Sequence, residues 1–352
     1  MPFNRTKPHH FGIVRPLALF GTTLLATMAS FAVPDSPLCV DGQCKPMISV
    51  VKHLDQEAFR ITDGKTEAVI VPAIGRIMSY GKVGGPNLIW NAPKGGIDTY
   101  GWTNYGGDKN WLGPQNSWTV WSGAWPPDKA IDGSPYEIEV ITGGKLRLTS
   151  PLSASTGIRF IRTLYFDASG DLVIEQTAKK EKGPKIKGSI WNITQATLGD
   201  AVFLPLNENS PYKNNFYSFY PSNTSQKTEA VKQNLLKVQL VAEGGGWKIG
   251  VDSPVSSLAS VKDGVAFVQK TAKPKGIYPD GAGENAGFPV EFYIWGNKET
   301  PYTELELLGP LRDFSVGTQW THTLRWSLHD LPSKDVNSKE VADAVQGLLM
   351  EK

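Results

Sequence analysis

The chain has 352 residues and a formal net charge of +2 at neutral pH, and 40% of its residues are hydrophobic. A chain of this length and composition can bury one large core or two smaller ones. Lys and Arg are balanced by Asp and Glu and form no basic cluster, which argues against nucleic acid or an anionic membrane surface as a partner.

The first 32 residues are typical of a secretory signal. A basic N-terminus precedes an apolar, uncharged stretch over residues 17–33, and the small residues Ser30 and Ala32 suit a cleavage site. Cleavage before Val33 removes three positive charges and no negative ones, which leaves a net charge of −1 on a periplasmic or secreted protein. The alternative is a retained signal anchor, although the stretch is slightly short for a membrane span. No later segment predicts a membrane-spanning helix.

The only two cysteines, Cys39 and Cys44, lie in the N-terminal segment 33–47. In an exported protein, a pair this close around an Asp-Gly turn predicts a small disulfide loop. The three histidines that remain after cleavage stand at no ligand spacing from this pair, so we expect no metal and no cofactor. They are His53, His322 and His329.

From residue 48 to 332, short segments alternate apolar and polar residues between turn signals such as Asp63-Gly64 and Ser169-Gly170. No Pro/Ser-rich linker interrupts the series. The pattern predicts a single all-β domain, a large antiparallel β-sandwich with well over ten strands. Residues 333–352 predict one helix, with Asn337 as N-cap and Glu340 three positions later, packed on the outside of the sandwich.

Six of the eleven tryptophans lie between Trp90 and Trp125, at spacings that match neither a strand nor a helix. We therefore expect a long ordered loop there, and loops of that length inside compact domains are usually functional. The structural alternative is that the rings form a small hydrophobic cluster, a satellite core, under the loop. Polar residues embedded among the rings argue for a ligand instead, because a buried polar group without a partner is costly.

An indole offers a flat apolar face with an N–H donor at its edge, which suits the C–H face and the hydroxyls of a sugar ring. The segment thus predicts a carbohydrate site, with a sugar or oligosaccharide as the ligand. The expected stacking rings are Trp111, Trp118 and Trp125. The expected polar partners are Asp108, Lys109 and Gln115.

Several runs resemble galactose-mutarotase-like proteins, the superfamily of the aldose 1-epimerases. The opening runs 61–64 and 67–77 resemble its first strands, and the runs 302–310 and 320–328 resemble its closing strands. Residues 106–115 read Gly-Gly-Asp-Lys-x-Trp-x-x-Pro-Gln, which is similar to the signature of a group of secreted bacterial proteins in that superfamily. The resemblance implies a β-super-sandwich with a sugar-binding cleft across one sheet.

The resemblance also implies a reaction, in which a glutamate takes the proton of the anomeric hydroxyl and a histidine protonates the ring oxygen. Glu304 falls at the position of the base, and Glu306 points to the same face and can bind a second hydroxyl. Gln195 stands where the family has its histidine, and an amide cannot act as the acid. Asp108 or Lys109 could supply that proton instead, with His322 as a weaker candidate.

Other classes of function stay open. The missing histidine favours a noncatalytic carbohydrate-binding module. Glu304 with Asp108 could form the carboxylate pair of a glycosidase. Arg76, in an early turn, is a candidate for substrate binding, and either it or Lys109 could neutralise charge in a polysaccharide lyase. A purely structural cell-envelope protein is favoured only if the tryptophans are buried, and the pattern predicts no particular oligomeric state.

Overall fold

The computed structural model describes residues 39–40, 43–44, 47–123, 125–219, 225–281 and 287–351. All that follows concerns the compact unit Asp35–Lys352. The predicted signal and its cleavage site lie outside the described residues.

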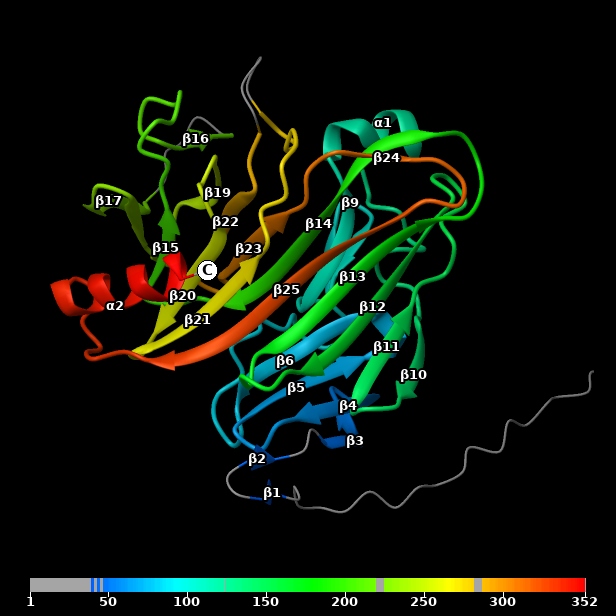
Figure 1. Ribbon diagram of the computed structural model, residues 1–352, viewed down its shortest axis with the longest axis horizontal. Coiled ribbons are helices and arrows are strands. Elements are labelled where there is room, and N and C mark those ends of the chain that lie inside the picture. Colours follow the sequence, from blue (N-terminus) through cyan, green and yellow to red (C-terminus); the bar gives the residue numbers. More distant parts are fainter. Residues whose placement is uncertain are drawn as a thin grey trace, which may run out of the picture. The chain divides into compact units, whose positions relative to one another are not determined.

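Two large antiparallel sheets make up the protein (Figure 1). The first has ten strands, in the spatial order β10 (Glu137–Ile141), β11 (Lys145–Thr149), β12 (Ile158–Phe166), β13 (Leu172–Lys180), β25 (Gln319–Asp330), β21 (Val265–Thr271), β20 (Ser256–Lys262), β15 (Ala201–Pro205), β18 (Leu235–Gln239) and β17 (Lys227–Lys232).

The second sheet has eleven strands. Its order is β16 (Tyr217–Ser218), β19 (Gly245–Val251), β22 (Val290–Gly296), β23 (Tyr302–Leu308), β14 (Ile186–Thr197), β9 (Asp108–Gly113), β6 (Arg76–Lys82), β5 (Thr66–Val71), β4 (Gln56–Thr62) and β3 (Met47–His53), and β24 (Arg312–Phe314) pairs with the start of β14. Two small pairs are β1 (Cys39–Val40) with β2 (Gln43–Cys44) and β7 (Ile97–Thr99) with β8 (Trp102–Asn104). The helical elements are η1 (Pro72–Ile74), η2 (Gln115–Ser117), α1 (Trp118–Trp121) and α2 (Lys339–Met350).

The main core lies between the two sheets and is built by two-residue alternation along each strand. In β12, every second side chain from Ile158 to Phe166 is buried, and Leu164 and Phe166 join one cluster with Ile174 of β13 and Leu305 of β23. A strand that presents apolar residues to one side and polar residues to the other can bury only one face. The all-β sandwich predicted from the sequence is confirmed.

Helix α2 packs on the outer face of the ten-stranded sheet, where Val341 and Val345 contact a cluster that contains Phe203 of β15. Its N-cap is Ser338, whose hydroxyl accepts the backbone N–H of Val341 at 3.3 Å. The predicted cap, Asn337, is wrong by one residue, because its side-chain oxygen is taken by Lys237 Nζ at 2.6 Å. Among the helices of the described residues, none is long and apolar enough to cross a membrane.

The N-terminal cysteines lie opposite each other in the register of β1 and β2, Cys39 with Cys44. This backbone register is the one that a short disulfide loop requires. The disulfide itself stays a prediction, and the Asp-Gly turn between the two strands lies outside the described residues.

The tryptophan-rich segment is not one long loop, because it contains the β7–β8 pair and then a central strand, β9. β9 pairs with β14 along its length and touches β6 at Asp108, and all six of its residues are buried. Because both faces of the strand are covered, its sequence lacks the two-residue alternation of apolar and polar residues that predicts a half-buried strand. The connection that follows begins at Pro114 and contains η2 and α1.

Candidate functional site

A cluster of charged side chains lies on the outer face of the eleven-stranded sheet, where strand register brings its members together. Leu305 and Leu307 of β23 point into the core, so Glu304 and Glu306 project from the opposite face. Glu304 is paired with Gln195 of β14 and with Tyr293 of β22. The structure therefore brings together three residues that the sequence predicted for the site, namely Glu304, Glu306 and Gln195.

Lys109 of β9 completes the centre of this cluster. Its Nζ lies 4.0 Å from Glu304 Oε1, and that oxygen accepts a 2.9 Å hydrogen bond from Gln195 Nε2. The rings of Trp102 and Trp111 flank the ammonium, with centroids 5.5 and 5.1 Å away. Among the described residues, Lys109 Nζ is buried without a hydrogen-bond partner. The rings and the carboxylate attract the ammonium, but a buried charge without a hydrogen-bond acceptor remains costly.

The environment moves the pKa values of both groups toward neutral pH. Burial lowers the pKa of Lys109 to about 8, with a further lowering by Arg76, while Glu304 opposes the shift. Burial raises the pKa of the Glu304 carboxyl, against the attraction of Lys109. The Glu304 side chain is 17% exposed and that of Lys109 is 3% exposed, so an approaching ligand meets the carboxylate first.

A second charged group, which includes the predicted Glu306, borders the first, and the sequence analysis missed its members Lys248 and Glu291. Lys248 of β19 lies 2.6 Å from Glu291 Oε2 and 3.0 Å from Glu306 Oε2, and Trp191 Nε1 donates to the same oxygen of Glu306 at 2.6 Å. Burial opposes the charge of Lys248, but the two carboxylates outweigh it and raise its pKa. Burial also raises the pKa of Glu291 well above its usual range.

Aromatic side chains border Glu304 on the other side. The ring centroids of Trp90 and Tyr302 are 4.5 Å apart, and those of Tyr302 and Tyr293 are 6.3 Å apart. Trp295, opposite Tyr302 in the register, is 38% exposed. Tyr293 and Trp295 also escaped the sequence analysis, although the alternation in Phe292-Tyr-Ile-Trp places both rings on one face.

Asp108, although adjacent to Lys109 in sequence, faces the opposite way and lies between the sheets. Its carboxylate pairs with Arg162 of β12 and accepts hydrogen bonds from Asn192 at 2.7 Å and Thr194 at 2.8 Å. Strand alternation separates it from the outer face. The structure does not bring Asp108 into one site with Glu304, which corrects the expectation that it could serve there as an acid or as a glycosidase partner.

His322 also lies between the sheets, where it hydrogen-bonds the backbone of Leu307, a residue of the core cluster. It therefore does not reach Glu304 from the outer face. Within the described ranges, no group of three or more His, Cys, Asp or Glu side chains could hold a metal ion.

Arg76 forms an ion pair with Asp132, which lies in the loop after the tryptophan segment. Its guanidinium donates to the Gly106 carbonyl at 2.5 Å and to Asp132 Oδ1 at 2.7 Å, and the Trp102 indole donates to the other oxygen of Asp132. Both partners of the ion pair are buried. Arg76 is close enough to Lys109 to lower its pKa, but its guanidinium is paired with Asp132. A contact of Arg76 with a substrate stays a prediction.

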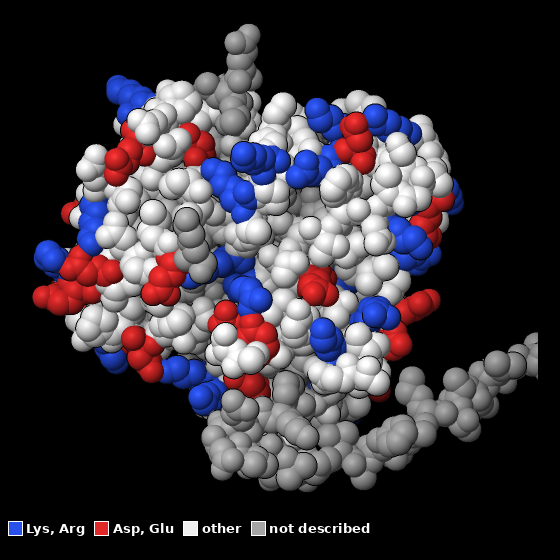
Figure 2. All heavy atoms as spheres, in the orientation of Figure 1, with Lys and Arg blue, Asp and Glu red and all other residues white. Residues whose placement is uncertain are grey.

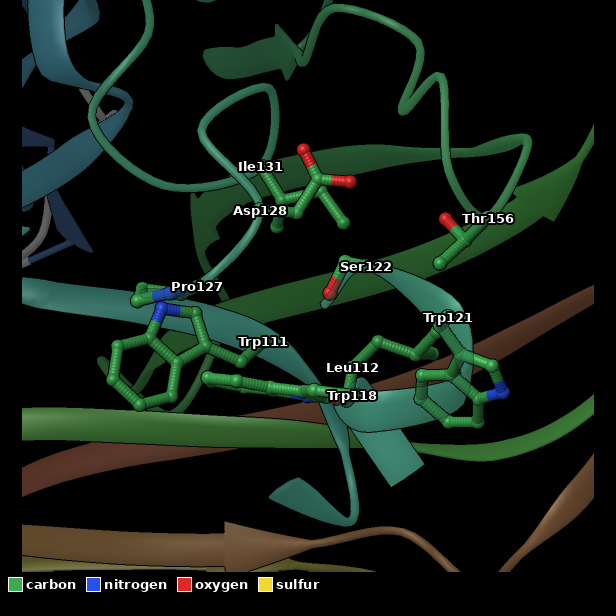
Figure 3. Close-up of a pocket in the computed structure, with 9 residues that line it drawn as sticks. All are labelled: Trp111, Leu112, Trp118, Trp121, Ser122, Pro127, Asp128, Ile131 and Thr156. Atoms are coloured by element: carbon green, nitrogen blue, oxygen red, sulfur yellow. The ribbon is translucent and has the colours of Figure 1, made fainter. Parts of the chain in front are cut away.

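The tryptophans of the segment pack against one another. Trp111 lies edge-to-face with Trp118 at 5.3 Å and with Trp191 at 5.3 Å, and Trp118 stacks on Trp125 at 6.3 Å. Figure 3 shows Trp111 and Trp118 below Pro127. These residues line a cavity of about 20 Å³. A space of that size holds about one water molecule.

The tryptophan cluster is therefore closed in this structure, in agreement with the satellite core considered from the sequence. Trp118 is 4% exposed, and its indole N–H donates to the Leu112 carbonyl at 2.7 Å. Gln115 is exposed in η2. A direct contact of Trp111, Trp118, Trp125 or Gln115 with sugar stays a prediction.

Comparison with known proteins places the fold. No family model and no curated protein matches the chain. Among solved structures, a galactose mutarotase-like protein from Lactobacillus casei aligns with a TM-score of 0.53 and 13% identity over 80% of this chain and 100% of that chain. A second galactose mutarotase-like protein, from Clostridium acetobutylicum, has a TM-score of 0.49 and 12% identity over 82% of this chain and 99% of that chain. The chain has the galactose mutarotase-like fold.

Replacing Trp118 with Ala should lower the free energy of unfolding by about 3–5 kcal/mol, because it opens a cavity among packed rings and leaves the Leu112 carbonyl without its donor. Urea unfolding followed by far-UV circular dichroism measures the change. Val120→Ala, on the exposed side of the same helix, is the control and should cost less than 1 kcal/mol. Equal stability of the two variants would show that the cluster is not part of the packed structure.

Proposed function

We propose that the protein binds a sugar on the outer face of the eleven-stranded sheet, at Glu304. The observation that carries this proposal is the arrangement of Glu304, a partly exposed carboxylate 4.0 Å from the buried ammonium of Lys109. A carboxylate fixed by an amide and a cation is a strong acceptor for ligand hydroxyls. The fold supports a carbohydrate ligand in general, because it is similar to that of a galactose mutarotase-like protein.

The surroundings of Glu304 suit a pyranose. Tyr293, Tyr302 and the half-exposed Trp295 offer ring faces for its C–H groups and polar edges for its hydroxyls. Glu306 and Gln195 lie beneath this surface and are fully buried. In this proposal they act by holding Lys248 and Glu304 in place, and the tryptophan cluster supports the strand that carries Lys109.

One observation favours turnover as a second candidate function. Lys109 and Glu304 are an acid and a base within 4.0 Å of each other, and their pKa values are shifted toward each other. Glu304 would take the proton of the anomeric hydroxyl while the ammonium of Lys109 protonates the ring oxygen, which opens the C1–O5 bond to an aldehyde. Rotation about C1–C2 and the reverse transfers give the other anomer. Because Nζ is covered, the Glu304 side chain must turn aside to let the ring oxygen reach it.

We also propose export to the periplasm or the medium, on the strength of the basic and apolar N-terminus and its small-residue cleavage site. This places the sugar site in an extracytoplasmic compartment. The proposal is independent of the chemistry at Glu304.

Glu304→Gln should abolish anomer exchange, lowering its rate by about 100-fold or more, because general-base transfer is lost. Lys109→Met should do the same if the ammonium is the acid. Exchange is measured by polarimetry on a panel of freshly dissolved aldoses, and binding by calorimetry. Glu299→Gln, an exposed carboxylate on the turn between β22 and β23, is the matched control.

The outcomes separate the two candidates. If the wild type binds sugar but does not exchange anomers, the protein is a noncatalytic carbohydrate-binding module. Loss of that binding in Glu304→Gln then supports the placement of the site at Glu304. If the wild type binds sugar without exchange, unchanged binding in a folded Glu304→Gln variant contradicts the placement of the site. If the wild type exchanges anomers, unchanged exchange in that variant contradicts it. Melting temperatures of all three variants show whether they fold.

Exchange should depend on pH with a maximum between two limbs. Activity rises with pH as the Glu304 carboxyl, whose pKa is raised, loses its proton and becomes a base. Activity falls above about pH 8 as Lys109 loses the proton that it must donate. The measurement is kcat/KM across that range, and a rate that stays constant well above pH 8 would remove Lys109 as the acid.

Mass spectrometry of the protein recovered from its native compartment should give an N-terminus at Val33. The expected mature protein begins there because Ser30 and Ala32 suit signal cleavage. An intact Met1 in a membrane fraction would instead support the retained anchor.

A further inference from the structure

A separate pocket of about 250 Å³ opens where β23 ends. Gly309 and Pro310, just after that strand, form one wall, and Arg312 of β24 and Trp320 of β25 form another. Glu304 lies four residues before the end of β23, which is roughly 13 Å along an extended strand. The pocket shares no lining residue with the Lys109–Glu304 site.

The wall of this pocket carries an indole and a guanidinium in fixed positions. Trp320 is 41% exposed, yet its N–H donates to the Asp313 carbonyl at 3.1 Å. The guanidinium carbon of Arg312 lies 5.0 Å from the centroid of that indole, and its Nη2 donates to the Lys275 carbonyl at 3.4 Å. Stacking and these backbone bonds hold both groups at the surface, and a preformed site costs less entropy when a ligand binds.

The remaining walls are mostly apolar. Ile190, Pro274 and Phe314 line the pocket, and His322 closes it from the interior. Burial lowers the pKa of His322 to about 4, so the ring is uncharged at neutral pH. The pocket volume of about 250 Å³ lies just below the roughly 300–1,000 Å³ of sites for drug-sized ligands, which suits a single six-membered ring with its substituents.

The electrostatic character of the pocket is positive. Arg312 is the charged lining residue, and the nearby Asp313 carboxylate is already paired with Lys185 at 2.8 Å. Figure 2 shows Lys and Arg side chains, with Asp or Glu side chains among them, over the upper part of the view, where Figure 1 labels β24. Among the residues that the structure describes, Arg312 forms no ion pair, and a guanidinium beside an aromatic face matches a planar carboxylate on a ring.

We propose that this pocket is a second ligand site that takes a six-membered ring bearing a carboxylate. The guanidinium of Arg312 binds the carboxylate, and the indole of Trp320 with Pro310 holds the ring face. Both a uronic acid and an aromatic carboxylate have this chemistry. The proposal does not depend on the function proposed for Glu304.

Fluorine NMR of protein labelled with fluorotryptophan tests the site, with the Trp320 signal assigned by its loss in Trp320→Phe. Titration with D-glucuronate should shift that signal saturably, whereas D-glucose should not. Arg312→Gln should weaken the response by about tenfold, because the charged hydrogen bonds to the carboxylate are lost. Lys145→Gln removes a comparable surface cation from a tyrosine ring, 3.7 Å from the centroid of Tyr165, and should leave the response intact.

A shift with benzoate but not with D-glucuronate would keep the ring-carboxylate site and identify the ligand as aromatic. No shift with either ligand at about 50 mM, which would fill most of a millimolar site, overturns the proposal. An equal response to D-glucose, or an unchanged affinity in Arg312→Gln, overturns it as well. Glu304→Gln should not alter the Trp320 signal, so failure here is distinct from failure at Glu304.

Discussion

The buried ion pair between Asp108 and Arg162 joins the two sheets at the centre of the protein. Asp108 belongs to β9 of the eleven-stranded sheet and Arg162 to β12 of the ten-stranded sheet, and both side chains are almost completely buried. Asn192 and Thr194 donate the remaining hydrogen bonds to the carboxylate. Loss of one partner would leave a buried charge uncompensated, which is strongly destabilising. The pair therefore fixes which face of β9 is turned inward.

The outer face depends on that orientation. With Asp108 inward, alternation turns Lys109 and Trp111 outward, and the register of β9 with β14 and of β14 with β23 brings Glu304 within 4.0 Å of Lys109. A shift of one residue in β9 would exchange the two charged side chains between faces. The same ladder continues to β22, where Glu291 faces Glu306 and both contact Lys248.

The sequence was sufficient for the fold class because most strands bury one face, and alternation then reveals them. It failed at β9, where both faces are covered and the tryptophans suggest a loop. Glu304, Lys109 and Gln195 could be proposed for one site, because a family resemblance and a polar group among the rings pointed to them. Asp108 could not be separated from Lys109 without knowing that the two lie on a strand. Lys248 and Glu291 could not be found at all, since their contact depends on register between strands far apart in sequence.

The tryptophan cluster has a spectroscopic consequence. Trp102, Trp111, Trp118 and Trp125 have ring centroids 5.3–6.3 Å apart in their contacts, close enough for their excited states to couple and exchange energy. Their near-ultraviolet circular dichroism is therefore a property of the group, and it will disappear when the rings lose their mutual orientation. Emission from the cluster will not belong to any single indole. Trp295 and Trp320, both substantially exposed, are the rings whose red-shifted emission and quenching by solutes can be attributed to separate places on the surface.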